Sequence, residues 1–254
     1  MFAIDLLDHM QKLYFLDEEI TVIFAPHIDD VFLSLGETIK SGELGENIVS
    51  VNMFNMSASS KNIKIRKRNF ENIAKTSKER MLEEFQFSKH LESYKINYLP
   101  FFWGIRDIRL QGLGTYLEGY SDEKVKKHFQ EKNLKFAINA FLNQLNPKKI
   151  KILFPTGLSE NMDHKILGKG ATEVGAYPKV GVFADIPYIS TFDSVEQIRK
   201  NIPRQFSKVY IKRFKAKEKM AEFNSIYDSQ INPEFEPKIS KIAKNMGEII
   251  FWKA

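Results

Sequence analysis

The sequence predicts an α/β fold in which a mostly parallel, Rossmann-like sheet carries helices on both faces. Short apolar runs typical of buried strands recur along the 254-residue chain, and helix-like stretches separate them. No internal repeat, low-complexity tract or obvious linker interrupts this alternation. We therefore expect residues 1–254 to form a single domain.

The expected strands are runs of apolar residues with the length and β-branched content that strands favour. The first is TVIFA, and the last is the short run GEIIFW near the C-terminus. In chain order, the strands are expected at 21–25, 47–54, 94–101, 149–156, 179–186 and 247–252.

The expected helices have apolar positions at helical spacing between these strands. VFLSLGETI can start a helix directly after the first strand and its PHIDD segment. The further helices are expected at 71–91, 122–145 and 163–176, and several more within the tail 213–246.

Composition excludes several classes of function. The chain has no cysteine, which rules out disulfides, thiol catalysis and zinc sites built from thiolates. A metal would need histidine and carboxylate ligands, and only five histidines are present. No apolar run is long enough for stable membrane insertion and no signal-peptide pattern opens the chain, so we expect a cytoplasmic protein.

The net charge of +6 is compatible either with a merely soluble basic surface or with an anionic partner. Basic residues concentrate at 64–68 and 208–219, but neither stretch has the interleaved aromatic residues of a base-stacking surface. We therefore expect no nucleic-acid partner.

Two polar clusters follow two of the expected strands. PHIDD, with His27, Asp29 and Asp30, follows the first strand, and Asp163 and His164 follow the strand at 149–156. Ligands of open α/β sheets bind outside the carboxyl ends of the strands, which is where both clusters fall. Two histidines and a carboxylate at that edge suit a metal site with open positions for water.

A simpler interpretation exists for PHIDD taken alone. Asp29 and Asp30 would cap the following helix, because its free N–H groups stabilise nearby carboxylates. His27 would be a hydrogen-bonded loop residue. The second cluster, at the end of another strand, favours the metal site over this interpretation. The remaining histidines have the appearance of helix-surface or helix-end residues.

The motifs resemble those of the LmbE-like, or PIG-L-like, zinc-dependent N-acetylglucosamine deacetylases. APHIDDVFLSLG is similar to the PHLDDA variant of one bacterial branch, and NMDH at 161–164 is similar to the family's H-x-D-H. The resemblance continues in the same order along the chain. It includes SKERMLEEFQFS (77–88), WGIRDIRLQGLG (103–114), VFADIPY (182–188), YDSQ (227–230) and GEIIFW (247–252).

The resemblance implies a role for each matching residue. His27, Asp30 and His164 would bind zinc, and Asp29 would be the general base. Asp163 would orient its neighbours. Arg106 and Asp107 would lie in the substrate loop and bind the substrate, and Asp185 would be a pocket or supporting residue.

The sequence departs from the family pattern at Asn161, where the family has a histidine. Asparagine can donate a hydrogen bond to an oxyanion, but it cannot carry a positive charge or deliver a proton. Val31 replaces a glutamate of the commoner motif, which the PHLDDA branch also lacks.

The resemblance implies a zinc-dependent N-deacetylase acting on an N-acetylated amino sugar or sugar conjugate, and the basic charge favours an anionic one. Two histidines and a carboxylate also suit Fe²⁺. One alternative is a metal-binding but catalytically weak relative that acts as a sugar-binding or accessory protein, which Asn161 favours. Another is a basic nucleic-acid-binding module without metal, which would not need His27, Asp30 and His164.

Overall fold

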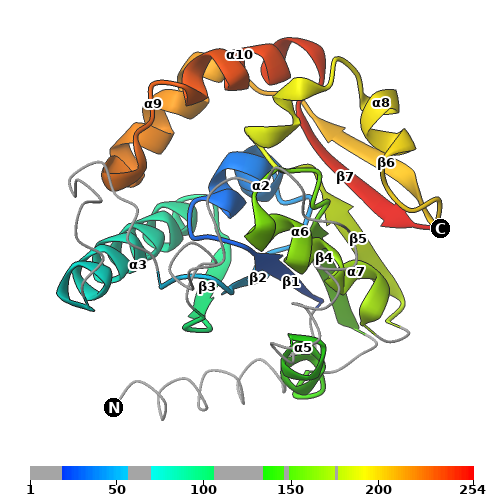
Figure 1. Cartoon of the computed structure of the whole chain (residues 1–254), viewed down its shortest axis with the longest axis horizontal. Helices are drawn as coiled ribbons and strands as arrows, with labels where there is room; N and C mark the ends of the chain where they lie inside the picture. The colour runs from blue at the N-terminus through cyan, green and yellow to red at the C-terminus, as the bar shows by residue number, and fades with distance from the viewer. Residues whose placement is uncertain (1–18, 57–69, 106–133, 146–148, 175–176) are drawn as a thin grey trace.

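The computed structural model describes residues 19–56, 70–105, 134–145, 149–174 and 177–254 (Figure 1). Its strands form one seven-stranded sheet in the order β3-β2-β1-β4-β5-β7-β6. Strands β1 to β5 are parallel, whereas β7 pairs antiparallel with both β5 and β6. The predicted mostly parallel α/β sheet is therefore confirmed. The strands are Ile20–Ala25 (β1), Asn47–Asn52 (β2), Asn97–Phe102 (β3), Ile150–Pro155 (β4), Lys179–Phe183 (β5), Phe206–Lys212 (β6) and Glu248–Lys253 (β7).

Helices lie between these strands, and the shorter helical segments follow β4, β5 and α9. They are α2 (Asp30–Lys40), α3 (Phe70–Glu92), α5 (Leu134–Leu142), α6 (Met162–Gly168), α7 (Gly170–Glu173), η3 (Tyr188–Thr191), α8 (Val195–Lys200), α9 (Ala216–Ile226), η4 (Asp228–Gln230) and α10 (Phe235–Asn245). No helix in this described part of the chain combines the length and the apolar character needed to cross a membrane.

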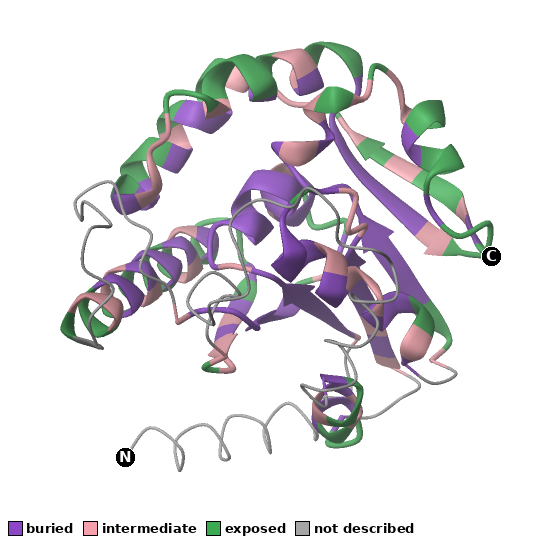
Figure 2. Cartoon of the chain, in the orientation of Figure 1, coloured by how far each residue is buried: buried purple, intermediate pink, exposed green. Residues whose placement is uncertain are grey.

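Helices cover both faces of the sheet, as predicted. Alternate residues of a strand point to opposite faces. On β3, the Tyr98 ring contacts Phe87 of α3 with a 5.1 Å centroid distance, whereas the Phe101 ring contacts Phe141 of α5 at 5.4 Å. In Figure 1, α2 lies above the sheet and α5 below it. The central strands β1 and β2 are consequently buried along their whole length (Figure 2).

Several predicted boundaries were wrong. The third strand begins at Asn97 instead of residue 94, because α3 ends in a turn in which Lys95 has a φ of 60°. The helix expected at 163–176 is two short helices that break at Lys169. Here the chain packs closely against β4: a Cβ added to Gly170 would lie 2.5 Å from the Phe154 ring. The first part of the helix expected at 122–145 lies outside the described residues, and the rest is α5.

Three elements were not predicted: β6, η3 and α8. β6 reads FSKVYIK and is paired within the described chain only with β7. Lysines are typical of edge strands, where they discourage pairing with another chain, and they interrupt the apolar run that identifies a strand. The predicted tail helices are present as α9 and α10, and the predicted last strand is β7.

A fully buried ion pair joins α9 to the C-terminal strand, and its carboxylate also binds α2. Glu248 of β7 accepts hydrogen bonds from the backbone N–H of Glu37 and Thr38, at 2.9 and 2.7 Å, and from the Thr38 hydroxyl. Its other partner is the Lys219 ammonium of α9, which is also fully buried. Removing either charged partner would leave an uncompensated buried charge. The Glu248 carboxylate, paired with Lys219, thereby ties the C-terminal part of α2 to β7.

The buried carboxyl group of Glu84, on α3, gives a prediction about pH. Burial raises the pKa of Glu84 to about 7, although hydrogen bonds from Tyr227, Tyr98 and Asn52 oppose the rise. A pKa that is higher in the folded state favours folding below the unfolded value of 4.5, and this contribution is lost as the pH rises through about 7. The loss amounts to about 3 kcal/mol at most.

We therefore expect Glu84→Gln to gain stability relative to the wild type as the pH rises from 5 to 8. Urea unfolding of both proteins at the two pH values measures this difference. Glu92→Gln, at the exposed end of the same helix, is the matched control and should show no such pH dependence. A Glu84→Gln difference that stays constant with pH would contradict the raised pKa.

Candidate metal centre

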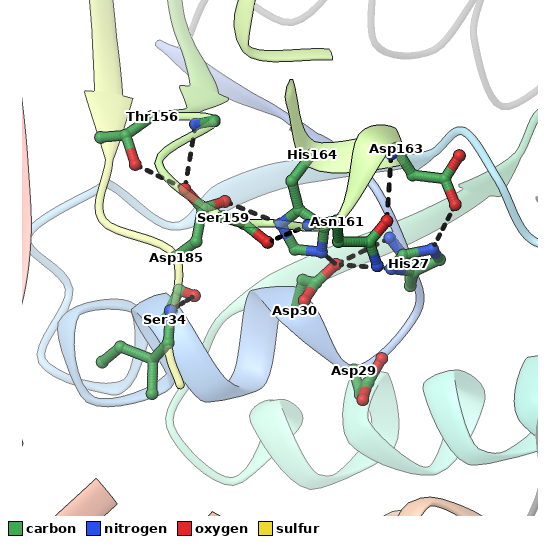
Figure 3. Close-up of polar contacts among 12 residues, drawn as sticks. His27, Asp29, Asp30, Ser34, Thr156, Ser159, Asn161, Asp163, His164 and Asp185 are labelled. Atoms are coloured by element: carbon green, nitrogen blue, oxygen red, sulfur yellow. Dashed lines mark hydrogen bonds and ion pairs between the residues drawn. The ribbon is translucent and has the colours of Figure 1, made fainter. Parts of the chain in front are cut away.

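The PHIDD and NMDH motifs come together at the position in the sheet where the order of the strands reverses. β1 lies between β2 and β4 in the sheet. The chain adds β2 and β3 on one side of β1 and then adds β4 and β5 on the other side. Such a switch point is where open α/β sheets bind their ligands, at the carboxyl ends of the strands. His27 follows β1 directly, and His164 lies on α6, which follows β4 (Figure 3).

Asp30 lies between the two histidines. Its Oδ2 atom is 3.3 Å from His27 Nδ1 and 3.4 Å from His164 Nε2. The same oxygen accepts a hydrogen bond from the backbone N–H of His27 at 2.8 Å, which closes the turn between β1 and α2. One potential ligand atom from each residue lies within 4.8 Å of the other two. The structure thus brings together the three residues that the resemblance implied as metal ligands.

Each histidine is oriented by a second carboxylate on its far nitrogen. His27 Nε2 lies 3.0 Å from Asp163 Oδ2, and His164 Nδ1 lies 2.9 Å from Asp185 Oδ1. Asp185 is itself held by the Thr156 hydroxyl and, at 3.0 Å, by the backbone N–H of Gly157. A carboxylate on one ring nitrogen orients the imidazole and leaves the other nitrogen free to bind a metal.

The chemistry of this group fits a bound cation. His164 is fully buried, and its Nε2 atom has no hydrogen-bond partner within the described part of the chain. A buried polar atom without a partner is rare because it loses its hydration without compensation. A metal ion between His164, Asp30 and His27 would supply that partner, and the donor set of two nitrogens and a carboxylate suits Zn²⁺ or Fe²⁺.

The same residues perturb one another electrostatically in the absence of metal. Burial alone would lower the pKa of His27, but hydrogen bonds and charge attraction from Asp163 and Asp30 raise it to about 10. Burial works to raise the pKa of Asp30, whereas His164 and His27 lower it overall. The site is therefore strongly anionic unless a cation, either a proton or a metal ion, is present.

Asp29 does not belong to the group of three potential ligands and contacts α3 instead. It precedes α2 and makes no capping hydrogen bond with its side chain. Its Oδ1 atom instead accepts a hydrogen bond at 2.9 Å from Nη2 of Arg80 on α3, and both residues are buried. Sequence reasoning did not select Arg80 as a site residue, although the stretch 77–88 had been matched to the family as a helix with a basic residue.

Asn161 serves as the N-cap of α6. Its Oδ1 atom accepts a hydrogen bond from the backbone N–H of Asp163 at 3.1 Å, and its own N–H donates to the Ser159 hydroxyl. Because the capping hydrogen bond uses the amide oxygen, the Nδ2 amino group remains available as a donor among the described residues. The position therefore combines a structural role with a hydrogen-bond donor next to His27 (Figure 3).

The predicted substrate residues Arg106 and Asp107 lie outside the described residues. Tyr188, in the matched VFADIPY stretch, was not selected from the sequence. Its ring packs edge-on against His164 with a centroid distance of 4.7 Å. It therefore forms part of the wall beside the histidine that carries the unpartnered nitrogen.

The fold and this side-chain group define an α/β protein with a candidate His-Asp-His metal centre at the sheet's switch point. The chain belongs to the PIG-L family of GlcNAc-PI de-N-acetylases, whose model matches residues 22–174. No curated protein sequence matches the chain significantly.

Solved structures of deacetylases share the fold. A deacetylase from the teicoplanin biosynthesis pathway has a TM-score of 0.62 and 15% identity, over 92% of this chain and 98% of that one. The zinc-inhibited form of teicoplanin deacetylase has a TM-score of 0.58 at 15% identity, over 92% and 98% of the two chains. N,N'-diacetylchitobiose deacetylase from Pyrococcus horikoshii has a TM-score of 0.54 at 14% identity, over 99% and 91%.

Proposed function

We propose that this protein is a metal-dependent hydrolase that removes the N-acetyl group from an N-acetylated amino sugar or sugar conjugate. The observation that carries the proposal is the group of His27, Asp30 and His164, with a separate carboxylate, Asp29, on the adjacent residue. Membership of a de-N-acetylase family supports the reaction class. Zn²⁺ is the proposed metal and Fe²⁺ the alternative.

His27, Asp30 and His164 would hold the metal ion. A bound Zn²⁺ would lower the pKa of a coordinated water to roughly 7 and polarise the acetyl carbonyl. Asp29 would take a proton from the attacking water and deliver one to the amine as the C–N bond breaks, so that acetate and a free amino sugar leave. Asp163 and Asp185 would keep the two imidazoles in place.

Asn161 would donate a hydrogen bond from Nδ2 to the carbonyl oxygen as negative charge develops on it. The N-cap hydrogen bond supports this orientation, because it occupies the amide oxygen and leaves the amino group available. Without a charged donor at this position, the rate would be lower by about a hundredfold, judging from the removal of single oxyanion donors in other enzymes.

The substrate class rests on less direct support. The family description refers to GlcNAc-PI, and two of the similar structures are deacetylases of teicoplanin biosynthesis and of diacetylchitobiose. The net charge of +6 favours a conjugate that bears a phosphate or carboxylate. Arg106 and Asp107 are the proposed contacts to the substrate.

A second candidate is a metal-binding relative with weak catalysis that recognises sugars in glycan or secondary-metabolite biosynthesis. Asn161 favours it, because an amide cannot carry a charge or deliver a proton. The intact group of three ligands and the separate Asp29 favour the hydrolase.

Metal content and acetate release, measured on one preparation, test the proposal. The protein is purified without a histidine tag, its metals are counted by mass spectrometry, and a panel of N-acetylglucosaminides is assayed for free acetate. We expect stoichiometric metal and acetate from at least one panel member. Metal without acetate from an anionic and neutral panel favours the weak relative, and a protein that binds no metal contradicts both candidates.

Asn161→His is expected to increase acetate release by about tenfold or more, because it restores a donor that can carry charge. Histidine is a poorer N-cap than asparagine, so a loss of stability of about 1 kcal/mol should accompany the gain. The measurement is kcat at pH 7 together with metal content and thermal unfolding.

Asn161→Asp is the matched control. Aspartate caps helices as well as asparagine but has no amino group to donate, so this variant should fold normally and lose activity. If both variants match the wild type in kcat, Asn161 does not face the reacting carbonyl.

A further inference from the structure

The C-terminal segment Tyr227–Gln230 is bound to the helix that carries Arg80. Glu83 of α3 accepts two hydrogen bonds from Ser229, one from the backbone N–H at 2.6 Å and one from the hydroxyl at 2.7 Å. The next residue, Glu84, accepts a hydrogen bond from the Tyr227 hydroxyl at 2.6 Å. This segment lies beyond residues 22–174, the part that the family model matches.

The contacts to the segment and the contact to Asp29 come from one face of α3. Arg80, Glu83 and Glu84 are three and four residues apart, which places them on the same side of a helix. All three are buried. Moving this face of α3 would therefore move the Arg80 guanidinium and both glutamates together.

Arg80 is held by charge attraction to Glu83 on the same helix and by its hydrogen bond to Asp29. Its Nη2 atom donates to Asp29, whereas its buried Nε atom has no hydrogen-bond partner in the described part of the chain. The Nε atom therefore gives the guanidinium no second anchor among these residues. The Arg80–Asp29 distance thus depends on how α3 is held.

We propose that Ser229 and Tyr227 are positioning residues for the Asp29 carboxylate, acting through Glu83, Glu84 and Arg80. They hold α3 in the position from which Arg80 Nη2 donates its hydrogen bond to Asp29 Oδ1 and so fixes the orientation of that carboxylate. The catalytic part of this inference rests on the proposed role of Asp29 as base. It assigns a function to a segment that makes no hydrogen bond to His27, Asp30 or His164.

Ser229→Ala removes one of the two hydrogen bonds to Glu83 and keeps the backbone bond. We expect kcat for acetate release to fall about tenfold, the size associated with one lost hydrogen bond to a charged group. KM and metal content should stay unchanged, and Ser229→Thr, which retains the hydroxyl, should restore kcat. Ser225→Ala is the matched control. The exposed Ser225 hydroxyl lies at the C-terminal end of α9 and donates a hydrogen bond to the Glu222 carbonyl of the same helix, not to α3.

A double-mutant cycle separates positioning from mere stability. In an Arg80→Ala background, Ser229→Ala should have no further effect on kcat, because the link to Asp29 is already broken. Effects of the two substitutions that multiply, or a kcat for Ser229→Ala within twofold of the wild type, would overturn the inference. Tyr227→Phe, measured in the same cycle, provides a second variant if Ser229→Ala fails to fold.

Hydrogen exchange keeps this test independent of the proposed activity. Amide exchange in Ser229→Ala should be faster than in the wild type around residues 78–84 and also around 29–31, and unchanged in Ser225→Ala. If the wild type releases no acetate, the proposed function fails while this comparison still decides the coupling. Faster exchange confined to the C-terminal segment would contradict the positioning role.

Discussion

Asp29→Asn is expected to retain the metal and to lower kcat by about a hundredfold to ten-thousandfold, the usual contribution of a general base. The amide has the same shape and can still accept the hydrogen bond from Arg80. It cannot take a proton from water. Measuring kcat, metal content and thermal unfolding on one preparation isolates the loss of the base from any loss of structure.

Asp193→Asn provides the control for removing a negative charge. Asp193 pairs with Lys241 on the surface, with an Oδ1–Nζ distance of 2.7 Å, and lies outside the candidate centre. We expect its activity to equal that of the wild type. Full activity in Asp29→Asn would show that Asp29 is not the base. Loss of metal from that variant would show that Asp29 helps to bind the metal, contrary to the proposed roles.

His164→Ala is expected to abolish stoichiometric metal binding and, with it, acetate release. The substitution removes the Nε2 atom that faces Asp30 and leaves Asp185 without its imidazole partner. Two remaining donors, His27 and Asp30, are too few for a typical protein zinc site. Metal content by mass spectrometry after dialysis, with circular dichroism to check folding, is the measurement.

His90→Ala is the matched control, because His90 lies on α3 and contacts Glu222 instead of the candidate centre. Its metal content should not change. His164→Gln offers a second variant in case the alanine substitution prevents folding. A His164→Ala protein that is folded and fully metal-loaded would refute the proposed ligands.

The strands of the sheet could be predicted because their signal is local. TVIFA and KIKILFP are apolar runs that any packing of the chain must bury, and β1 and β4 begin and end within a residue or two of the prediction. β6 was missed because its edge position permits lysines, so its sequence resembles a loop. Whether a strand lies at the edge or in the buried centre depends on the whole sheet, so the β6 sequence alone did not identify it as a strand.

The residue types at the candidate centre could also be predicted, since PHIDD and NMDH each follow a strand. The absence of cysteine restricted any metal to histidine and carboxylate ligands. The resemblance to a family then singled out His27, Asp30 and His164.

Only the tertiary structure placed His27 beside Asp163, 136 residues away in sequence, and His164 beside Asp185. It also paired Asp29 with Arg80 and the YDSQ segment with α3. The sequence determined which groups are available, because composition and periodicity are properties of single segments. Which groups touch depends on the order of strands in the sheet and the packing of helices against it, and no single segment carries that information.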